Sequence, residues 1–420
     1  MKIHSLELTN IRGFTHAKLN FQLGFNLIVG INGVGKTTVL ESLRVVLSHL
    51  LPEATLSKNK KESFDLYDIQ IEKENLQLDA IISFDEEKFS FMIAKHKEKT
   101  KIVNTENIRA QTFDVKNRSE FKPDIPKDYK EILNQPLGIF YSSHRSLMNE
   151  EKPTKSQTVG GKAVAFAEAL NSKREFALRL FADWFIAQEE LAKENVNLLD
   201  KIHSIKKAIY TFLPEFSSLK VIKDLRNENN TFSIVKNKKE LSFQQLSDGE
   251  RSILGLVFDI ARRLSIANPS LENPLLGQAV ILIDELDLHL HPKWQRTIVS
   301  DLQRTFPNCQ FIATTHSPQI ISSVVPENIQ IIKNFEVDQT IKSYGLDINW
   351  ILRFIMEDND RIKESEEAIK KVQKLMNEVE FEEARSLINK YKKEKLDLEE
   401  WVIFEARMSH LEMFEDEEDN

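Results

Sequence analysis

The run from residue 30 to residue 37 reads GINGVGKT, and these residue types at this spacing could hold a triphosphate. Glycines let the backbone curl so that successive N–H groups face a phosphate, and a following helix adds its positive N-terminal end. Lys36 would reach the β- and γ-phosphates, while the Thr37 hydroxyl would bind Mg²⁺. The alternative is a flexible glycine turn that binds nothing. We assign nucleotide contacts to Asn32, Gly33, Gly35, Lys36 and Thr37 of this run and to Thr38, which follows it.

A second reactive run, AVILIDE at residues 279–285, ends in two adjacent carboxylates. Its apolar residues predict a buried strand that would bring Asp284 beside the metal ion, through water. Glu285, one residue on, would point towards the attacking water as its general base. Adjacent carboxylates at a strand end are costly without a cation, and Mg²⁺ would supply one.

The run LSDGER at residues 246–251 predicts the capped start of a helix over residues 251–264. Ser247 is a good N-cap residue, and the N–H groups of a capped helix start can bind an anion. Ser247, Gly249 and Glu250 are therefore candidate anion contacts, and the family resemblance given below implies that the anion belongs to a nucleotide. The alternative is a capped helix with no ligand.

Two further runs contain histidine. His316 follows a short apolar strand in TTHSP, residues 314–318. In LDLHLHP, residues 286–292, the alternation places Asp287, His289 and His291 on one side, which would suit either a metal site or a loop that packs across a dimer seam.

Apolar runs predict the elements that must position these residues. Compact runs predict buried strands at residues 25–29, 137–141, 280–283 and 310–314. Helices are expected at residues 36–51, where Pro52 lies just beyond the end, at 163–213 and at 292–305, and residues 63–115 are expected to be β-rich. The pattern predicts an α/β fold, a mixed sheet with an antiparallel flank.

Together these motifs resemble those of ABC-type ATPases of the group that contains RecF, SMC and OLD-nuclease proteins. The resemblance covers residues 1–50 and 240–335, including IRGF at 11–14 and DELDLHLHP at 284–292. It implies an ABC-type P-loop ATPase head, with ATP and Mg²⁺ as cofactors. It also implies a head-to-tail homodimer, in which each ATP lies between Lys36 of one copy and Ser247 and Gly249 of the other.

The same resemblance implies roles for three further residues. His316 resembles the switch histidine that contacts the γ-phosphate and orients the attacking water, so it is a candidate catalytic residue with Glu285. Arg12 would contact the nucleotide. The glutamine usual after the strand at 137–141 is not evident, because YSSHR stands there, and Arg145 is our candidate replacement.

Composition sets the domain organisation. The 420 residues carry a net charge of −8, of which residues 357–420 contribute −10, from 11 Lys/Arg and 21 Asp/Glu. An acidic helical module is therefore expected at the C-terminus, either docked on the body or available for self-association. We divide the chain into an ATPase lobe at 1–145, a helical insertion with lead-in strands at 146–240, a second lobe at 241–343, and the module at 344–420. The second lobe contains the signature run LSDGER, the Walker B run AVILIDE and the switch histidine His316.

Several classes are excluded. The single Cys309 rules out a disulfide framework and a multi-cysteine metal site, and it suits a cytoplasmic protein. No apolar run approaches the length of a membrane span. About 100 residues between Arg145 and the signature run cannot form long SMC-type arms. We find no strands with the acidic residues of a TOPRIM nuclease and no HNH motif, so we expect ATP hydrolysis without intrinsic nuclease activity.

The run YGLDINWIL at residues 344–352 resembles the tail of PtuA-type ATPases of Septu and retron-associated antiphage systems. This resemblance implies an ATPase that associates with itself and with a separate HNH-type nuclease partner. The alternative function is a RecF- or SMC-like repair clamp that binds DNA directly. Its basic groove would use Lys95, Lys97, Lys99 and Lys101, or Lys236, Lys238 and Lys239, although both runs could equally be solvated edges.

Overall fold

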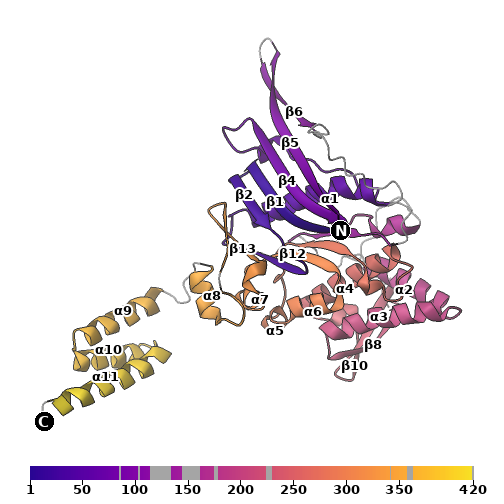
Figure 1. The fold of residues 1–420 in the computed structure, drawn as a ribbon. Coiled ribbons are helices and arrows are strands. Elements are labelled where there is room, and N and C mark those ends of the chain that lie inside the picture. The colour runs from indigo at the N-terminus through magenta and orange to yellow at the C-terminus, as the bar shows by residue number, and fades with distance from the viewer. Residues whose placement is uncertain are drawn as a thin grey trace. The chain divides into compact units, whose positions relative to one another are not determined.

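The computed structural model describes residues 1–84, 87–102, 105–113, 134–143, 161–174, 178–223, 229–340, 342–356 and 363–418. The chain divides into two compact units, Met1–Ile351 and Leu352–Asn420. The α/β fold predicted from the sequence is confirmed in the first unit, where three sheets and several helices are combined (Figure 1).

A six-stranded sheet forms the centre of the first unit. Its strands are parallel apart from the edge strand β14, and four of them are entirely buried because both faces of the sheet are covered. The order is β14 (Glu336–Asp338), β13 (Ile329–Lys333), β3 (Phe25–Val29), β12 (Cys309–Thr315), β11 (Ala279–Ile283) and β7 (Leu137–Tyr141).

Helix α1 (Lys36–Ala54) starts directly after the glycine run and packs on this sheet. The prediction that it ends before Pro52 is wrong. Proline lacks an N–H and cannot donate to the carbonyl four residues back. The helix nevertheless continues for another turn, because the Thr55 N–H and hydroxyl both donate to the Leu51 carbonyl, at 2.8 and 2.6 Å.

An antiparallel sheet of five strands flanks the central sheet, as expected for residues 63–115 (Figure 1). Alternating buried residues of β1 face the core, and a register shift between Ile3 and Ser5 keeps Leu6 and Leu8 buried. The order is β2 (Phe14–Asn20), β1 (Lys2–Ile11), β4 (Asn75–Phe84), β5 (Glu87–Ile102) and β6 (Thr105–Phe113).

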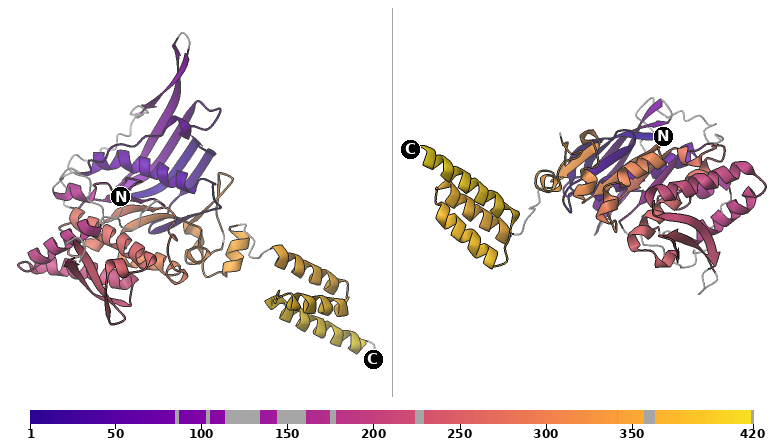
Figure 2. Two further views of the ribbon diagram at one scale, coloured as in Figure 1. Left: turned by 180° about the vertical axis from the view of Figure 1, so that it is seen from behind. Right: turned by 90° about the horizontal axis from the view of Figure 1, so that it is seen from below.

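A third group of elements lies together in Figure 2. It contains a short antiparallel sheet and three α-helices. Two of the helices and one strand share a cluster of phenylalanine rings that includes Phe181, Phe232 and Phe258. Its members are η3 (Gly161–Ala165), α2 (Leu178–Ala192), α3 (Val196–Phe212), β8 (Phe216–Lys223), β9 (Asn230–Lys236), β10 (Lys239–Ser242) and α4 (Asp248–Ala267).

The expectation of helix throughout residues 163–213 is wrong for residues 166–174, which form turns. Their carbonyl groups are used elsewhere. Arg263 donates hydrogen bonds to the carbonyls of Ala165 and Ala167, and the Phe140 N–H of β7 donates to the Ala169 carbonyl. The helix expected at 292–305 is also divided, into α5 (Pro292–Gln295) and α6 (Ile298–Thr305).

Short elements complete the first unit: η1 (Leu66–Asp68), η4 (Phe243–Gln245), η5 (Pro274–Leu276), α7 (Pro318–Ile321), η6 (Pro326–Asn328) and most of α8 (Ile348–Phe354). The described helices include none that is both long enough and apolar enough to cross a membrane.

The second unit contains three antiparallel helices, α9 (Lys363–Asn377), α10 (Phe381–Lys393) and α11 (Glu399–Glu418) (Figure 1). They enclose a core of their own, in which Trp401 stacks on Tyr391 and donates its indole N–H to the Leu396 carbonyl. Helix α10 packs against both α9 and α11.

Candidate nucleotide site

Three parallel strands bring the predicted motifs to one edge of the central sheet. The register pairs Val29 of β3 with Thr315 of β12, and Ala313 with Ile283 of β11. The glycine run, the two carboxylates and His316 each follow one of these strands. They therefore meet at the carboxyl ends of the strands, where ligands bind in open α/β sheets.

The glycine run has a backbone suited to a phosphate. Gly33 and Gly35 have φ values of 84° and 103°, in the region that disfavours other residues. A Cβ on Gly35 would also lie 2.5 Å from the Phe14 ring. Residues 31–33 are exposed, so their backbone is open to a ligand.

Lys36 turns its ammonium group onto this loop. Its Nζ donates to the carbonyls of Gly30 and Ile31, at 2.7 and 2.8 Å. Burial lowers the pKa of Lys36 to about 8, against the opposing effect of the nearby carboxylates of Asp284, Glu285 and Asp287. A phosphate would offer this cation stronger acceptors than two carbonyl groups.

Thr37 and Asp284 converge from different strands. The Thr37 hydroxyl donates to the two Asp284 oxygens, at 3.1 and 3.4 Å, and the Thr314 hydroxyl donates to Oδ1 at 2.7 Å. One carboxylate and one hydroxyl beside a phosphate loop are the hard oxygen donors that Mg²⁺ prefers. The residues present therefore fit that ion together with a bound phosphate.

Glu285 follows Asp284 after β11, and His316 follows the end of the neighbouring strand β12. Glu285 has a φ of 50°, and its N–H donates to Thr314 Oγ1 at 2.7 Å. Asp287 accepts hydrogen bonds from the Thr315 hydroxyl and the His316 N–H, at 2.6 and 3.1 Å. Burial, and then the charge of Lys36, lower the pKa of His316, so its ring is neutral at neutral pH.

Arg12 reaches the start of α1. Its Nη1 donates to Thr38 Oγ1 at 3.2 Å, and its Nε forms an ion pair with Asp68 at 2.8 Å. The Arg12 N–H also donates to the Asp68 carbonyl. Asp68 is a site residue that sequence reasoning missed, since it lies 56 residues from its partner in no recognisable motif.

The Ser247 run is capped as predicted, because Ser247 is the N-cap of α4. Its hydroxyl donates to the Glu250 carboxylate at 2.8 Å and accepts from the Glu250 N–H at 3.4 Å. Glu250 is buried and forms an ion pair with Lys236, and these partners lower its pKa despite burial. This carboxylate positions the serine.

Gly249 is fixed by close packing. A Cβ at this position would lie 2.6 Å from the His289 carbonyl oxygen and 2.9 Å from the Trp294 ring. The start of α4 therefore packs against residues 286–292 of the same chain. Ser247 and Glu250 form hydrogen bonds with each other, and Glu250 also pairs with Lys236.

The metal alternative for residues 287, 289 and 291 is wrong within the described part of the chain, which holds no group of three His, Cys, Asp or Glu side chains able to bind a metal. Asp287 is bonded to Thr315, His289 is exposed, and His291 Nδ1 accepts from the Lys293 N–H at the start of α5. Arg145 lies outside the described residues.

Among the described members of the two lysine runs, three have partners within the chain. Lys95 is buried and donates to the Phe64 carbonyl, and Lys97 donates to the Lys73 carbonyl at 2.7 Å. Lys236 is paired with Glu250. Lys238 and Lys239 are exposed at the turn between β9 and β10, and nothing is described of the side chains of Lys99 and Lys101.

Comparison with known proteins supports the sequence interpretation. The chain is 28% identical to Septu protein PtuA from Bacillus thuringiensis, over 85% of this chain and 83% of that protein. It is 27% identical to the retron Ec83 probable ATPase of Escherichia coli, over 85% and 76% of the two chains. The predicted resemblance to retron and PtuA-type ATPases is confirmed.

A solved SMC head domain, bound to the C-winged helix domain of ScpA, matches 82% of this chain and 98% of its own, with 15% identity and a TM-score of 0.47. Residues 25–322 match the family model described as "AAA domain, putative AbiEii toxin, Type IV TA system". This match includes the glycine run, the Ser247 run, both carboxylates and His316, and the chain belongs to that AAA-domain family.

Proposed function

We propose that this chain is an ATPase that binds ATP and Mg²⁺ between two of its copies and regulates a separate nuclease in antiphage defence. The observation that carries the proposal is the convergence of Lys36, Thr37 and Asp284 at one sheet edge, with Glu285 and His316 beside them.

The nucleotide would replace contacts that the chain makes within itself. Lys36 would exchange the Gly30 and Ile31 carbonyls for phosphate oxygens, and the N–H groups of Gly33 and Gly35 would surround the β-phosphate. Arg12 and Thr38 would add contacts at the start of α1. Thr37 and Asp284 would hold Mg²⁺, which would neutralise phosphate charge.

Glu285 is the proposed general base. It follows a buried strand, and the Thr314 hydroxyl fixes both its backbone N–H and the neighbouring Asp284. The lowered pKa of His316 gives a neutral ring, which can both donate and accept a hydrogen bond and so orient the attacking water. Asp287 holds the His316 backbone in place.

A second copy would complete the site. The family resemblance implies that Ser247 of one chain contacts the γ-phosphate of the ATP held by another. An anion would compete with Glu250 for the Ser247 hydroxyl and meet the positive start of α4. One triphosphate would then bridge two chains, and loss of its γ-phosphate would favour their separation.

Defence and the nuclease partner rest on the relatives. Both relatives compared above have names that place them in a Septu or a retron system. The partner we propose is an HNH-type nuclease, which this chain would control through the ATP-dependent association of its copies.

Glu285→Gln tests the function. We expect phosphate release to fall by about 10²–10⁴-fold, because the variant cannot accept the proton of water. Sedimentation velocity should show a dimer that persists with ATP and Mg²⁺. Glu327→Gln, in η6, is the matched control and should keep normal hydrolysis. Hydrolysis by Glu285→Gln at the normal rate would show that the base is another group.

A further inference from the structure

The turn between β13 and β14 carries a phenylalanine in a backbone conformation that suits glycine. Lys333 pairs with Glu336, so the turn consists of Asn334 and Phe335, and their φ values are 48° and 64°. A two-residue turn of this kind needs positive φ at both positions, which favours asparagine followed by glycine. A bulky residue at positive φ is strained, and such strain persists only where the surrounding structure holds it.

The turn between β9 and β10 has the same conformation and serves as a comparison. It consists of Asn237 and Lys238, whose φ values are 49° and 66°. Lys238 is exposed, whereas Phe335 is half-buried. The two turns therefore differ in their second side chain, and that of Phe335 packs against other parts of the chain.

The Phe335 ring lies against Phe14 and two glycines. The two rings meet edge to face, with their centroids 5.5 Å apart. A Cβ on Gly13 would overlap the Phe335 ring. A Cβ on Gly35 would lie 2.5 Å from the Phe14 ring and 3.4 Å from the Phe335 ring. Both glycine backbones thus approach the aromatic pair more closely than a residue with a Cβ would allow.

Both glycines adjoin the nucleotide site. Gly35 is the N-cap of α1 and directly precedes Lys36. Gly13 directly follows Arg12, whose guanidinium donates to Thr38 Oγ1 at 3.2 Å. The aromatic pair therefore supports the backbone next to two of the side chains that we assign to the nucleotide.

The same hairpin also supports the beginning of the glycine run. Strand β13 pairs with β3, which leads into the run, and a Cβ on Gly30 would overlap the Ile332 carbonyl oxygen. A Cβ on Gly33, in the middle of the run, would meet nothing within 4 Å. The hairpin thus holds the two ends of the run, at Gly30 and Gly35, and leaves its middle open to a ligand.

We propose that Phe335 is a positioning residue of the phosphate loop, which acts through Phe14 and Gly35 to hold the glycine run in the conformation that surrounds a phosphate. This inference rests on the proposed function, because it concerns the same ATP site. A loop that is already ordered loses less conformational entropy when its ligand binds. The strained turn therefore raises the affinity of the chain for ATP.

Phe335→Gly tests this role in the full chain by steady-state phosphate release. Glycine suits a φ of 64°, so the variant loses the ring and relieves the strain together. We expect the KM for ATP to rise about tenfold, since ATP must then order the loop itself. The kcat should stay near the wild-type value, because Glu285 and His316 follow other strands.

Two variants accompany it. Lys238→Gly makes the same backbone change in the matching turn and should keep the wild-type KM. Phe335→Leu keeps an apolar side chain in place of the ring, and we expect a smaller rise in KM. Thermal unfolding checks that each variant is folded, and Phe335→Leu replaces Phe335→Gly as the test if the glycine variant does not fold.

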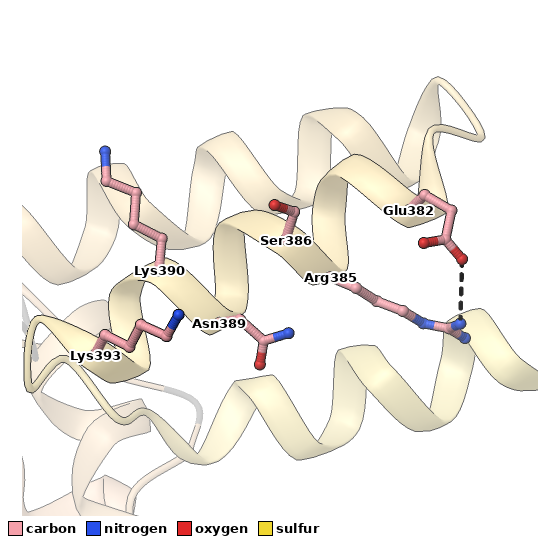
Figure 3. Close-up of a pocket in the computed structure, with 6 residues that line it drawn as sticks. All are labelled: Glu382, Arg385, Ser386, Asn389, Lys390 and Lys393. Carbon is pink, nitrogen blue, oxygen red and sulfur yellow. Dashed lines mark ion pairs between the residues drawn. The ribbon is translucent and has the colours of Figure 1, made fainter.

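The second unit provides a control for cationic groups outside the ATP site. A polar hollow of about 650 Å³ lies along α10, and Figure 3 shows Lys390 and Lys393 among its lining residues. Both lysines are exposed, and exposed ammonium groups attract a triphosphate. Lys390→Ala/Lys393→Ala should nevertheless hydrolyse ATP with the wild-type KM and kcat, because KM reports on the glycine run.

The possible failures can be told apart. An unchanged KM in Phe335→Gly, or an equal rise in Lys238→Gly or in the α10 variant, would overturn the positioning role and leave the proposed function standing. A fall in kcat at unchanged KM would also overturn it, because the ring would then act on a later step. A wild-type chain that releases no phosphate from ATP would refute the proposed function, and this inference with it.

Discussion

Lys36 holds its charge in a place that is unfavourable until a phosphate arrives. Its nearest acceptors are two backbone carbonyls, and burial lowers its pKa from 10.5 to about 8. Below pH 8 Lys36 is protonated in both states, but its charge is less favourable in the folded chain than in the unfolded chain. This difference lowers the free energy of unfolding. This destabilisation becomes smaller as the pH rises from 8 to 10.5, since Lys36 then loses its proton in the folded chain and keeps it in the unfolded chain.

Lys36→Met should therefore stabilise the nucleotide-free protein at pH 7, by at most about 3 kcal/mol in the free energy of unfolding. The difference from wild type should become smaller between pH 8 and pH 10. Urea unfolding at several pH values measures it, with the exposed Lys342→Met as control. ATP should no longer raise the stability of the variant. An unchanged or lower stability at pH 7 would contradict the lowered pKa.

A site residue can be predicted from the sequence when it belongs to a short contiguous motif. Lys36, Thr37, Asp284 and Glu285 could be predicted because each stands in a short run whose types imply its chemistry. The role of Thr314 could not be predicted. It depends on the register between β11 and β12, which places its hydroxyl 2.7 Å from an aspartate 30 residues away.

At the scale of elements, a buried ionic cluster joins α4 to β7. Asp259 of α4 accepts from the Tyr141 hydroxyl at 2.8 Å and from Arg263 Nε at 3.0 Å, and it pairs with Arg174 at 2.9 Å. Burial opposes the ionisation of Asp259, but the two arginines overcome it and hold its pKa well below the ordinary value. The same cluster holds residues 161–174 in place, because Arg174 belongs to it and Arg263 donates hydrogen bonds to two carbonyls of this segment.

Asp259→Asn should destabilise the first unit by about 3–5 kcal/mol, because it leaves two buried arginines without their counter-charge. The wild-type carboxylate stabilises above its unfolded pKa, and this stability is lost as the pH falls through the lower folded pKa. The loss in the variant should thus be present from pH 7 down to about pH 5, as thermal unfolding can measure. Asp338→Asn, exposed on β14, is the control. An Asp259→Asn protein as stable as wild type would refute the cluster's importance.

Element existence could be predicted better than element ends. The apolar runs predicted all four fully buried strands of the central sheet, since short continuous apolar runs are typical of parallel strands covered on both faces. The turns at 166–174 and the continuation of α1 past Pro52 could not be foreseen. The turns depend on distant donors, Arg263 and the Phe140 N–H, which local propensity does not contain. The continuation of α1 depends on the two hydrogen bonds of Thr55, which outweigh the effect of Pro52.

The whole molecule consists of two units with separate cores. Residues 352–420 enclose their own apolar cluster around Trp401, and the proposed ATP site lies within Met1–Ile351. Stabilisation by a ligand acts only on the unit that binds it.

Calorimetry of the full chain should therefore show two unfolding transitions. A nucleotide at about 100 times its dissociation constant adds about 2.7 kcal/mol to the unit that binds it, and should raise one transition by a few degrees while the other stays fixed. Trp401→Ala should lower the fixed transition alone, which assigns it to the second unit. A single transition that nucleotide shifts as a whole would show that the units unfold together.

The capping box around Ser247 has a consequence for how steeply the chain responds to its ligand. Because the serine hydroxyl already has a partner in Glu250, an arriving phosphate gains one bond at the loss of another, and the net change is small. Lys36 must also give up its two carbonyl acceptors before it can bind phosphate oxygens. A triphosphate that bridges two chains must therefore replace several internal hydrogen bonds at once. We expect the fraction of dimer to rise steeply above a threshold concentration of triphosphate, not gradually.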